Sequence, residues 1–200
     1  MKGVSLETLR GVDLDAALID ELATLRIGIF RDWPYLYDGT IDYERQYLAH
    51  LKGDRDAAIV IARDGAKVVG PATASPMLHQ EPAFRGPLER LGEDPSGFFY
   101  FGESVLVPEC RGRGIGHAFF DAREGAALAM GARATCFYAV VRQQDHPLRP
   151  SSARDLHPFW TKRGYRPLPD AVASYEWKDV DQVAPRQHRL QLWLRRLAPA

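Results

Sequence analysis

The chain has 200 residues, a length typical of one domain, so we expect residues 1–200 to form a single domain. Hydrophobic residues make up 46% of it, enough for a buried core, which excludes a disordered protein. The 26 basic residues balance the 26 acidic ones, so the broad positive field of proteins that bind nucleic acid or anionic membranes is missing. We therefore expect neither partner.

The two cysteines, Cys110 and Cys136, are too few for a disulfide-stabilised secreted scaffold and do not form a Cys-x-x-Cys pair. No apolar run reaches about 18 residues, and the opening residues MKGVSLETLRGVDLD lack the apolar segment of a signal peptide. These features predict free thiols and a cytoplasmic protein.

The first half of the chain alternates helical and strand patterns. Apolar residues three and four positions apart predict a helix over residues 13–30, which ends before the Trp33-Pro34 pair. Thr40 is placed to cap a second helix over residues 41–52, which stops at Gly53. Two apolar runs, residues 57–63 and 67–75, flank Asp64-Gly65 and predict a β-hairpin.

The second half begins with residues 76–97, a stretch rich in proline and glycine that we interpret as a long loop. The elements predicted after it are a strand over 98–107, a helix over 116–130, a strand over 134–141, a polar loop over 142–152, a short helix over 154–162, and two strands around 173–179 and 188–194. The last of these also fits a helix. The order, βαα-ββ-β-α-β-α-ββ, predicts a mixed α/β (α+β) fold with helices packed on a sheet.

A glycine-rich turn, CRGRGIG, follows the predicted strand over 98–107 and opens the next helix. Glycines let backbone N–H groups converge on an anion, and a helix N-terminus adds partial positive charge. Arg111 and Arg113 would add charge-assisted hydrogen bonds to phosphates. The spacing does not match the GxGxxG dinucleotide fingerprint or the GxxxxGK phosphate loop. A tight turn without a ligand is the alternative interpretation.

The turn resembles the Arg/Gln-x-x-Gly-x-Gly motif of the GNAT superfamily of N-acetyltransferases, carried here by Arg111, Gly114 and Gly116. Downstream, FWTKRGY resembles that family's FYxxxGF junction, and the close resemblance covers about residues 98–166. It implies a mostly antiparallel sheet with about four flanking helices, splayed between the strands of Glu103 and Tyr138. It also implies acetyl-CoA or another acyl-CoA as co-substrate. The implied contact residues are Val105, Leu106, Val107, Arg111, Gly112, Arg113, Gly114, Ile115, Gly116, Phe159 and Trp160.

Acyl transfer to an amine needs a base, because the amine must lose a proton before it attacks the thioester. Glu103, on the motif strand, is the candidate; the alternative is that it only pairs with an arginine or faces solvent. A strand N–H near Val105 or Val107 would polarise the thioester carbonyl.

The family's usual acid for the leaving thiolate is a tyrosine where this chain has Trp160, whose indole is too weak an acid for that task. Tyr138, Tyr100 or His146 is then the candidate acid, or the thiolate leaves without one, since a thiol of pKa about 8.5 is a tolerable leaving group.

The resemblance places two loops beside the acceptor. The first offers Trp33, Tyr35 and Tyr37, and the second Arg142, Asp145 and His146. Together they predict an aromatic wall, an acidic group for an ammonium, and an arginine, Arg142 or Arg149, for a carboxylate or phosphate. We expect a small polar amine as acceptor. The alternatives are core packing for Tyr35 and a solvated loop for Arg142 and Asp145.

The six histidines show no HxxxH or His/Cys spacing, so we expect no metal. Cys110 adjoins the glycine-rich turn and lacks a histidine partner, so we expect a spectator thiol. By resemblance, a homodimer is plausible.

The sequence thus predicts an acetyl-CoA-dependent N-acetyltransferase acting by direct transfer in a ternary complex. The alternatives are a non-catalytic acyl-CoA-binding module and an NAD(P)-dependent oxidoreductase.

Overall fold

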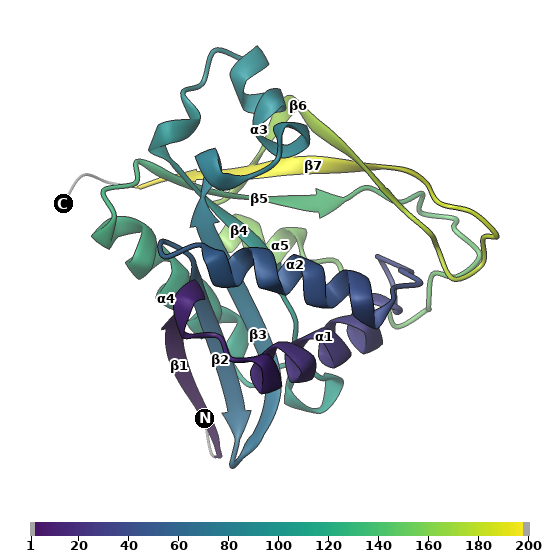
Figure 1. Cartoon of the computed structure of the whole chain (residues 1–200). Coiled ribbons are helices and arrows are strands. Elements are labelled where there is room, and N and C mark those ends of the chain that lie inside the picture. The colour runs from purple at the N-terminus through teal and green to yellow at the C-terminus, as the bar shows by residue number, and fades with distance from the viewer. Residues whose placement is uncertain (1–2, 198–200) are drawn as a thin grey trace.

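A computed structural model describes residues 3–197 and is built around a seven-stranded sheet of order β1-β2-β3-β4-β5-β7-β6 (Figure 1). The strands are β1 (Val4–Arg10), β2 (Ala58–Asp64), β3 (Lys67–Pro76), β4 (Phe98–Ser104), β5 (Ala134–Val140), β6 (Arg166–Trp177) and β7 (Arg186–Arg196). Every neighbouring pair is antiparallel except β4 and β5, which are parallel. The mixed, mostly antiparallel sheet expected from the sequence is confirmed.

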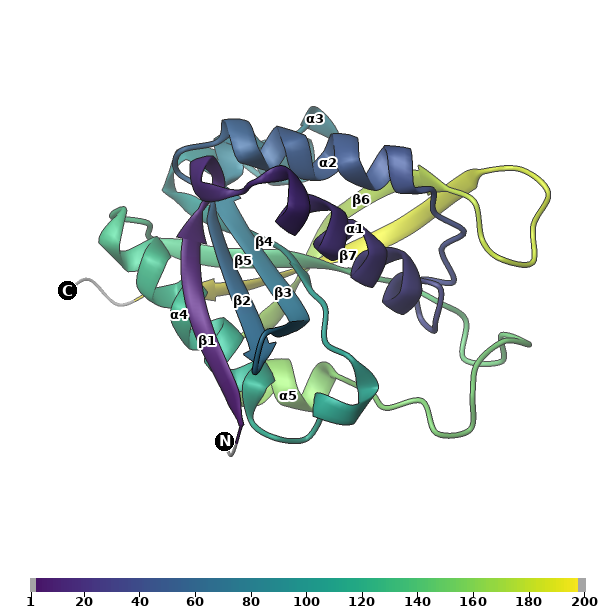
Figure 2. The ribbon, with the colours of Figure 1, turned by 60° about the horizontal axis from the view of Figure 1, so that its bottom comes forward.

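Helices lie on both faces of this sheet (Figures 1 and 2). They are α1 (Ala16–Phe30), α2 (Ile41–Gly53), α3 (Pro82–Arg90), α4 (Ile115–Ala129) and α5 (His157–Lys162). Side chains alternate along a strand, so Ile59 and Ile61 of β2 pack with α1 and α2, whereas Val60 and Ala62 pack with α4. The sheet is therefore a central layer with a hydrophobic cluster on each face.

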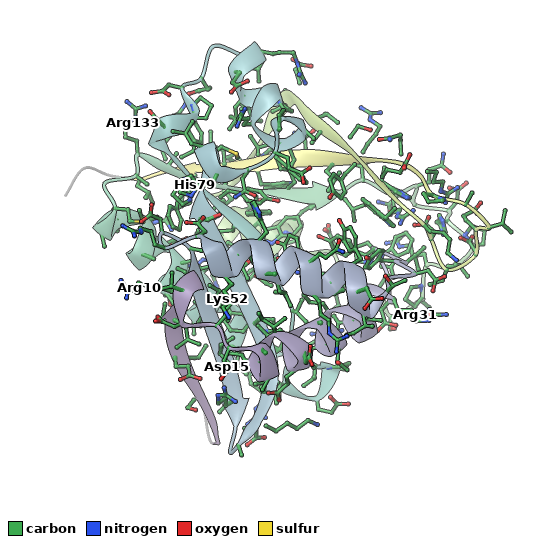
Figure 3. All side chains as sticks on the ribbon, viewed as in Figure 1. Arg10, Asp15, Arg31, Lys52, His79 and Arg133 are labelled. Atoms are coloured by element: carbon green, nitrogen blue, oxygen red, sulfur yellow. The ribbon has the colours of Figure 1, made fainter. Side chains whose placement is uncertain are left out.

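The first two helices begin where the chain supplies a cap. Asp15, at the start of α1 in Figure 3, accepts a hydrogen bond from the Leu18 N–H at 2.8 Å, so the helix starts three residues later than predicted. Thr40 caps α2 in the same way, through the Tyr43 N–H. The predicted helices at both places are confirmed, apart from this shift.

The long loop predicted over residues 76–97 is wrong in part, because it contains α3. Pro82 occupies the first turn, where its missing N–H is no loss, and Leu88 is fully buried against the sheet. A proline-rich segment can therefore form a helix when one proline occupies its first turn and its apolar side chains pack against the sheet.

The C-terminal elements also differ from the expectation. The short helix begins at His157, three residues late, and β6 and β7 are longer than predicted. His188, Leu190 and Leu192 alternate inward along β7, which pairs with both β5 and β6. That pairing on two sides excludes the helical alternative for this segment.

The two parallel strands separate soon after they meet. β4 and β5 pair only from Phe98–Ala134 to Tyr100–Cys136, although both continue for four more residues. This is the splay that the resemblance implied. Among residues 3–197, none of the helices has the length and apolar character needed to span a membrane.

Candidate active site

The glycine-rich turn leads into the first turn of α4, where backbone N–H groups have no carbonyl partner among the described residues. Gly112 and Gly114 have φ of +75° and +84°, and a Cβ built on either would meet nothing within 4 Å. Within residues 3–197 no carbonyl accepts from the N–H groups of Ile115–His117, and the first helical bond is from Ala118 to Gly114 O. Open space, free donors and the helix dipole together suit a phosphate anion.

The two arginines of the turn lie at its edge. Arg111 donates from Nε to Leu106 O at 3.1 Å, which holds the turn against the end of the strand. Arg113 Nη1 lies 3.8 Å from the Cys110 Sγ, and Cys110 is buried beneath the turn. Cys110 thus packs as a small apolar side chain.

The second motif comes to the same place through α5. Phe159 lies 3.8 Å from the position of a Cβ on Gly116, and its ring packs edge-on against His117. Trp160 packs against Phe137 of β5 at 5.0 Å between ring centroids. The structure therefore brings both motifs together at the N-terminus of α4, on the side where β5 has left β4.

The backbone beyond β4 offers one N–H to the open side of that strand. Val105 and Val107 donate to β3 carbonyls, of Pro71 and Val69, at 2.8 and 2.9 Å. Their N–H groups are thus occupied by the sheet, whereas the sequence placed the carbonyl-polarising N–H near these two residues. Successive N–H groups alternate along an extended chain, so the Leu106 N–H points the other way, toward the gap left by β5. Of these three residues, Leu106 alone has an N–H without a carbonyl partner among residues 3–197.

A β-bulge directs Glu103. The register passes from Ala74↔Phe101 to Ala72↔Ser104, so Thr73 alone faces two residues, Gly102 and Glu103. The extra residue reverses the alternation, and the Glu103 side chain reaches the α1/α2 face instead of the α4 face. It stands three residues past the end of the β4–β5 pairing.

Glu103 is buried and has two partners on that face. Arg26 Nη1 of α1 lies 2.5 Å from its Oε1, and the Tyr47 hydroxyl of α2 donates to Oε2 at 2.9 Å. The Arg26 Nε also donates to Glu44 of α2. Glu103 therefore pairs with an arginine, as the alternative interpretation allowed, and a 7% exposed fraction keeps it at the edge of solvent.

Tyrosines surround this carboxylate and stay protonated. Burial, with Glu103 nearby, raises the pKa of Tyr35 to about 12 and raises the pKa values of Tyr47 and Tyr100 well above the usual value. The pKa of Tyr138 is also raised, chiefly by burial, and its hydroxyl donates to Phe84 O at 2.7 Å. Tyr138 is thus bonded to the backbone of α3.

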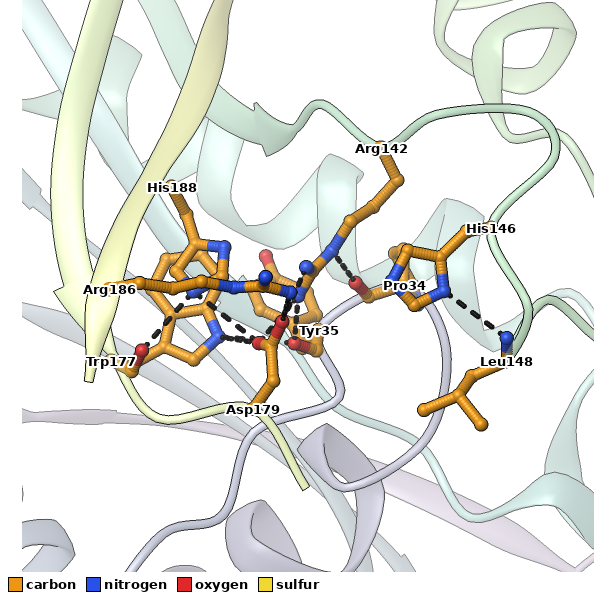
Figure 4. A network of polar contacts seen from close by, with 9 residues as sticks. All are labelled: Pro34, Tyr35, Arg142, His146, Leu148, Trp177, Asp179, Arg186 and His188. Atoms are coloured by element: carbon orange, nitrogen blue, oxygen red, sulfur yellow. Dashed lines mark hydrogen bonds and ion pairs between the residues drawn. The ribbon is translucent and has the colours of Figure 1, made fainter. Parts of the chain in front are cut away.

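The acceptor loops are joined by a buried ion pair (Figure 4). Arg142 donates to both Asp179 oxygens, at 2.7 and 2.9 Å, and to the carbonyls of Pro34 and Tyr35. Its guanidinium is therefore occupied, and it does not suit the role of substrate-carboxylate ligand expected from the sequence. Although burial opposes ionisation, hydrogen bonds from Arg142 and Arg186 hold the pKa of Asp179 at about 2.

The other predicted acceptor residues divide into two groups. Tyr35 and Tyr37 lie near the buried charges: Tyr35 packs on Phe30, and burial beside Glu44 raises the pKa of Tyr37. Trp33 and His146 pack together at the surface, 5.5 Å between ring centroids. A surface cavity of about 370 Å³ is lined by Gln144, Asp145, His146, Arg149, Pro150 and Ser151.

One cluster of metal-ligand side chains lies apart from this site. Atoms of Asp54, Asp56 and His79 come within 4.8 Å of one another at the end of α2. The His79 Nδ1 lies 2.8 Å from an Asp54 oxygen, and the other Asp54 oxygen accepts from the Asp56 N–H. These contacts use both oxygens of the central carboxylate.

Three charged residues of the site were missed by the sequence reasoning: Arg26, Glu44 and Asp179. The sequence pattern contained a signal for two of them, Arg26 and Glu44. Arg26 continues the buried stripe of Leu18 and Leu22 at a spacing of four, and Glu44 stands four residues before the buried Leu48. A charge within an apolar stripe requires a buried partner. Asp179 gave no such signal, because its partners come from distant loops.

Comparisons with known proteins agree with this geometry. No protein-family model matches the chain, and no curated protein matches its sequence. Solved structures do match. An acetyltransferase from Streptococcus agalactiae aligns at TM-score 0.62 and 15% identity, over 98% of this chain and 100% of its own.

Two further matches extend the comparison. An aminoglycoside 6'-N-acetyltransferase complexed with coenzyme A aligns at TM-score 0.61 and 15% identity, over 98% of each chain. A GCN5-related N-acetyltransferase from Kribbella flavida aligns at 0.59 and 15%, over 98% of this chain and 99% of its own. The chain therefore has the fold of the GNAT superfamily of acetyltransferases.

Proposed function

We propose that this protein is an N-acyltransferase that moves an acetyl group from acetyl-CoA to a primary amine of a small molecule, by direct transfer in a ternary complex. The observation that carries the proposal is the cradle of free N–H groups at Ile115–His117, next to a splay where a bulge presents Glu103. An anion site and a carboxylate that both lie near the C-terminal end of β4 are what acyl transfer from a CoA thioester to an amine requires.

The residues present fit a coenzyme A molecule. The N–H groups of Ile115–His117 would bind the pyrophosphate, with Arg111 and Arg113 at its rim. The exposed backbone beyond β4, including the Leu106 N–H, is free to bond the pantetheine arm and the acyl carbonyl. Coenzyme A supplies the activated thioester. A relative of the same fold, the aminoglycoside 6'-N-acetyltransferase, binds coenzyme A, which supports this assignment.

Glu103 is the group that removes the amine's proton, directly or through one water. The amine nitrogen then forms a C–N bond with the acyl carbon, the C–S bond breaks, and its electron pair leaves on sulfur. The product amide has lost two protons from the starting ammonium: one neutralises the thiolate, and one is released to solvent. A thiol of pKa about 8.5 leaves acceptably near neutral pH, so no tyrosine at Trp160 is needed.

Binding is the first test. A thermal-shift titration compares acetyl-CoA with NADPH and ATP at matched concentrations. Ligand at about 100 times its Kd stabilises a protein by about 2.7 kcal/mol, a shift of several degrees at this size. We expect acetyl-CoA alone to raise the midpoint. A rise with NADPH alone would instead favour the oxidoreductase, although the mostly antiparallel sheet differs from a parallel dinucleotide-binding fold.

Catalysis is the second test, and it separates the enzyme from a module that only binds acyl-CoA. The burial of Glu103 against Arg26 is the observation that keeps that alternative open. In an assay of thiol release with a panel of primary amines, Glu103→Gln should lower kcat by about 100-fold or more and leave acetyl-CoA affinity unchanged. No amine-dependent thiol release from the wild-type protein, despite acetyl-CoA binding, would favour the binding module.

A further inference from the structure

Glu44 has an environment that its position in the sequence does not explain. Acidic residues in the first turn of a helix usually interact with the helix dipole at the surface. Glu44 is in the first turn of α2, yet it is fully buried, and it accepts a hydrogen bond from Arg26 Nε. Its Oε1 has no hydrogen-bond partner in residues 3–197. Burying a carboxylate of this kind lowers the stability of the fold unless a neighbouring charge compensates it.

Arg26 stands between two carboxylates. Its Nε side faces Glu44 and its Nη1 faces Glu103, while the guanidinium lies over the rings of Tyr47 and Phe30, at 4.2 and 5.0 Å from their centroids. All three charged side chains are at most 8% exposed. On this face of the sheet one positive charge is therefore shared by two negative charges.

Arg26 is the only cation in the described residues that forms an ion pair with the Glu103 carboxylate, although the charge of Arg123 also acts on it through the sheet. Tyr35, Tyr47 and Tyr100 face it from the first loop, α2 and β4, and remain neutral. Arg123 of α4 lies on the far face of the sheet. It bonds the backbone carbonyls of Thr73, Glu103 and Phe119 and the Ser104 hydroxyl, and has no ion pair with a carboxylate among the described residues.

We propose that Glu44 is a positioning residue for Glu103: by taking a share of the Arg26 charge, it leaves Glu103 with an uncompensated negative charge that binds a cationic amine. With Arg26 alone, Glu103 would form a neutral pair and be a weaker base. With Glu44 present, an ammonium group completes the charge balance of two carboxylates and two cations. The proposal rests on the proposed function, since it describes how the same site receives its acceptor.

The charge balance also defines the acceptor. Arg26 is held between two carboxylates, and Arg142 is occupied by Asp179, so both of these arginines are already paired. The half-buried rings of Tyr35, Tyr37 and Tyr47 provide aromatic surface, which suits an organic cation. The acceptor that fits beside Glu103 is an organic amine that brings a positive charge to these two carboxylates.

The test follows the Glu103 carboxyl directly by NMR in protein labelled with ¹³C at the glutamate carboxyl carbon, with Glu103→Gln to assign the signal. In Glu44→Gln, which keeps the shape of the side chain and removes its charge, the midpoint of the Glu103 titration should fall, because the Arg26 charge is then no longer shared. Glu44→Asp, which keeps the charge, should stay near the wild-type midpoint. An unchanged or higher midpoint in Glu44→Gln overturns the proposal.

A matched control and a second variant complete the design. Glu124 is a partly buried carboxylate on the other face, paired with Arg163 and Arg195, and Glu124→Gln should leave the Glu103 midpoint unchanged. If Glu44→Gln does not fold, R26M/E44Q removes the whole ion pair, a change that buried pairs often tolerate. The midpoint should then rise less than in Arg26→Met, which keeps the Glu44 charge, and equal rises in the two variants overturn the proposal. If acetyl-CoA does not bind, the proposed function is wrong. The titration can still be interpreted, because it follows the Glu103 carboxyl without any ligand.

Discussion

Arg142 and Asp179 form a two-pronged ion pair across 37 residues of sequence, with the carboxylate fully buried and the guanidinium 7% exposed. The pair joins the loop after α1, the loop after β5 and the β6–β7 connection (Figure 4). Trp177 and Arg186 also bond Asp179, and His188 stacks on Trp177 at 3.7 Å. One carboxylate thus holds three loops beside the proposed acceptor site.

Arg142→Met should therefore lower the stability of the protein. Removing one partner of a buried pair leaves an uncompensated charge, and with Arg186 still on Asp179 we expect a loss of about 3 kcal/mol in the free energy of unfolding. Arg45→Met is the control, because the Arg45–Asp20 pair has the same 2.7 Å distance but lies about half exposed. It should cost less than about 1 kcal/mol. Equal losses in urea unfolding would contradict the assignment.

The same carboxylate predicts a pH dependence. The pKa of Asp179 is lowered to about 2 in the folded protein, so its ionised form stabilises the fold above the unfolded pKa of about 3.9. That stability is lost as the pH falls from about 4 toward 2. The stability gap between wild type and Asp179→Asn, measured by urea unfolding, should be wide at pH 7 and narrow by pH 2.5. A stability difference that does not vary with pH would show that the Asp179 charge does not contribute to the stability of the fold.

Gly114→Val tests the phosphate cradle. The new side chain would enter the open space in front of the free N–H groups, and acetyl-CoA affinity should fall by at least about 30-fold, or about 2 kcal/mol. Gly131→Val is the matched control: Gly131 also has positive φ, +73°, and open space around its Cβ position, but it follows the other end of α4. Both should lose similar stability, about 1–2 kcal/mol, from the left-handed backbone. Calorimetry should find acetyl-CoA affinity intact only in Gly131→Val.

Gly102→Ala tests the bulge that directs Glu103. A Cβ at Gly102 would lie 2.6 Å from Thr73 Oγ1 and 3.2 Å from the Tyr47 hydroxyl, so the contacts that hold Glu103 must shift. Acyl transfer should fall about tenfold or more, because small misplacements of reacting groups are costly. Gly125→Ala, where a helical Cβ meets nothing within 4 Å, should leave activity unchanged and stabilise the protein by up to about 1 kcal/mol. Full activity in Gly102→Ala would show that the bulge has no part in positioning the base.

Local chemistry was readable from the sequence because it depends on neighbouring residues. The turn from Arg111 to Gly116, its place between a strand and a helix, and the Thr40 cap of α2 follow from backbone preferences within a few positions. The mixed sheet followed from the order of these elements. The proline content of residues 76–97 gave a wrong prediction of a loop, because α3 lies within this segment.

Long-range pairing decided the rest. Strand alternation directs Glu103 to the α4 face, and only the pairing of β4 with β3 introduces the bulge that reverses it. Arg26, Glu44 and Glu103 come from three elements, and Arg142 meets Asp179 from another two parts of the chain. Such contacts depend on how the elements pack, and no spacing along the sequence encodes them. The sequence by itself determined the glycine-rich turn and its place before a helix; the tertiary structure decided which charges surround Glu103, because buried charges find their partners only when the helices and loops pack.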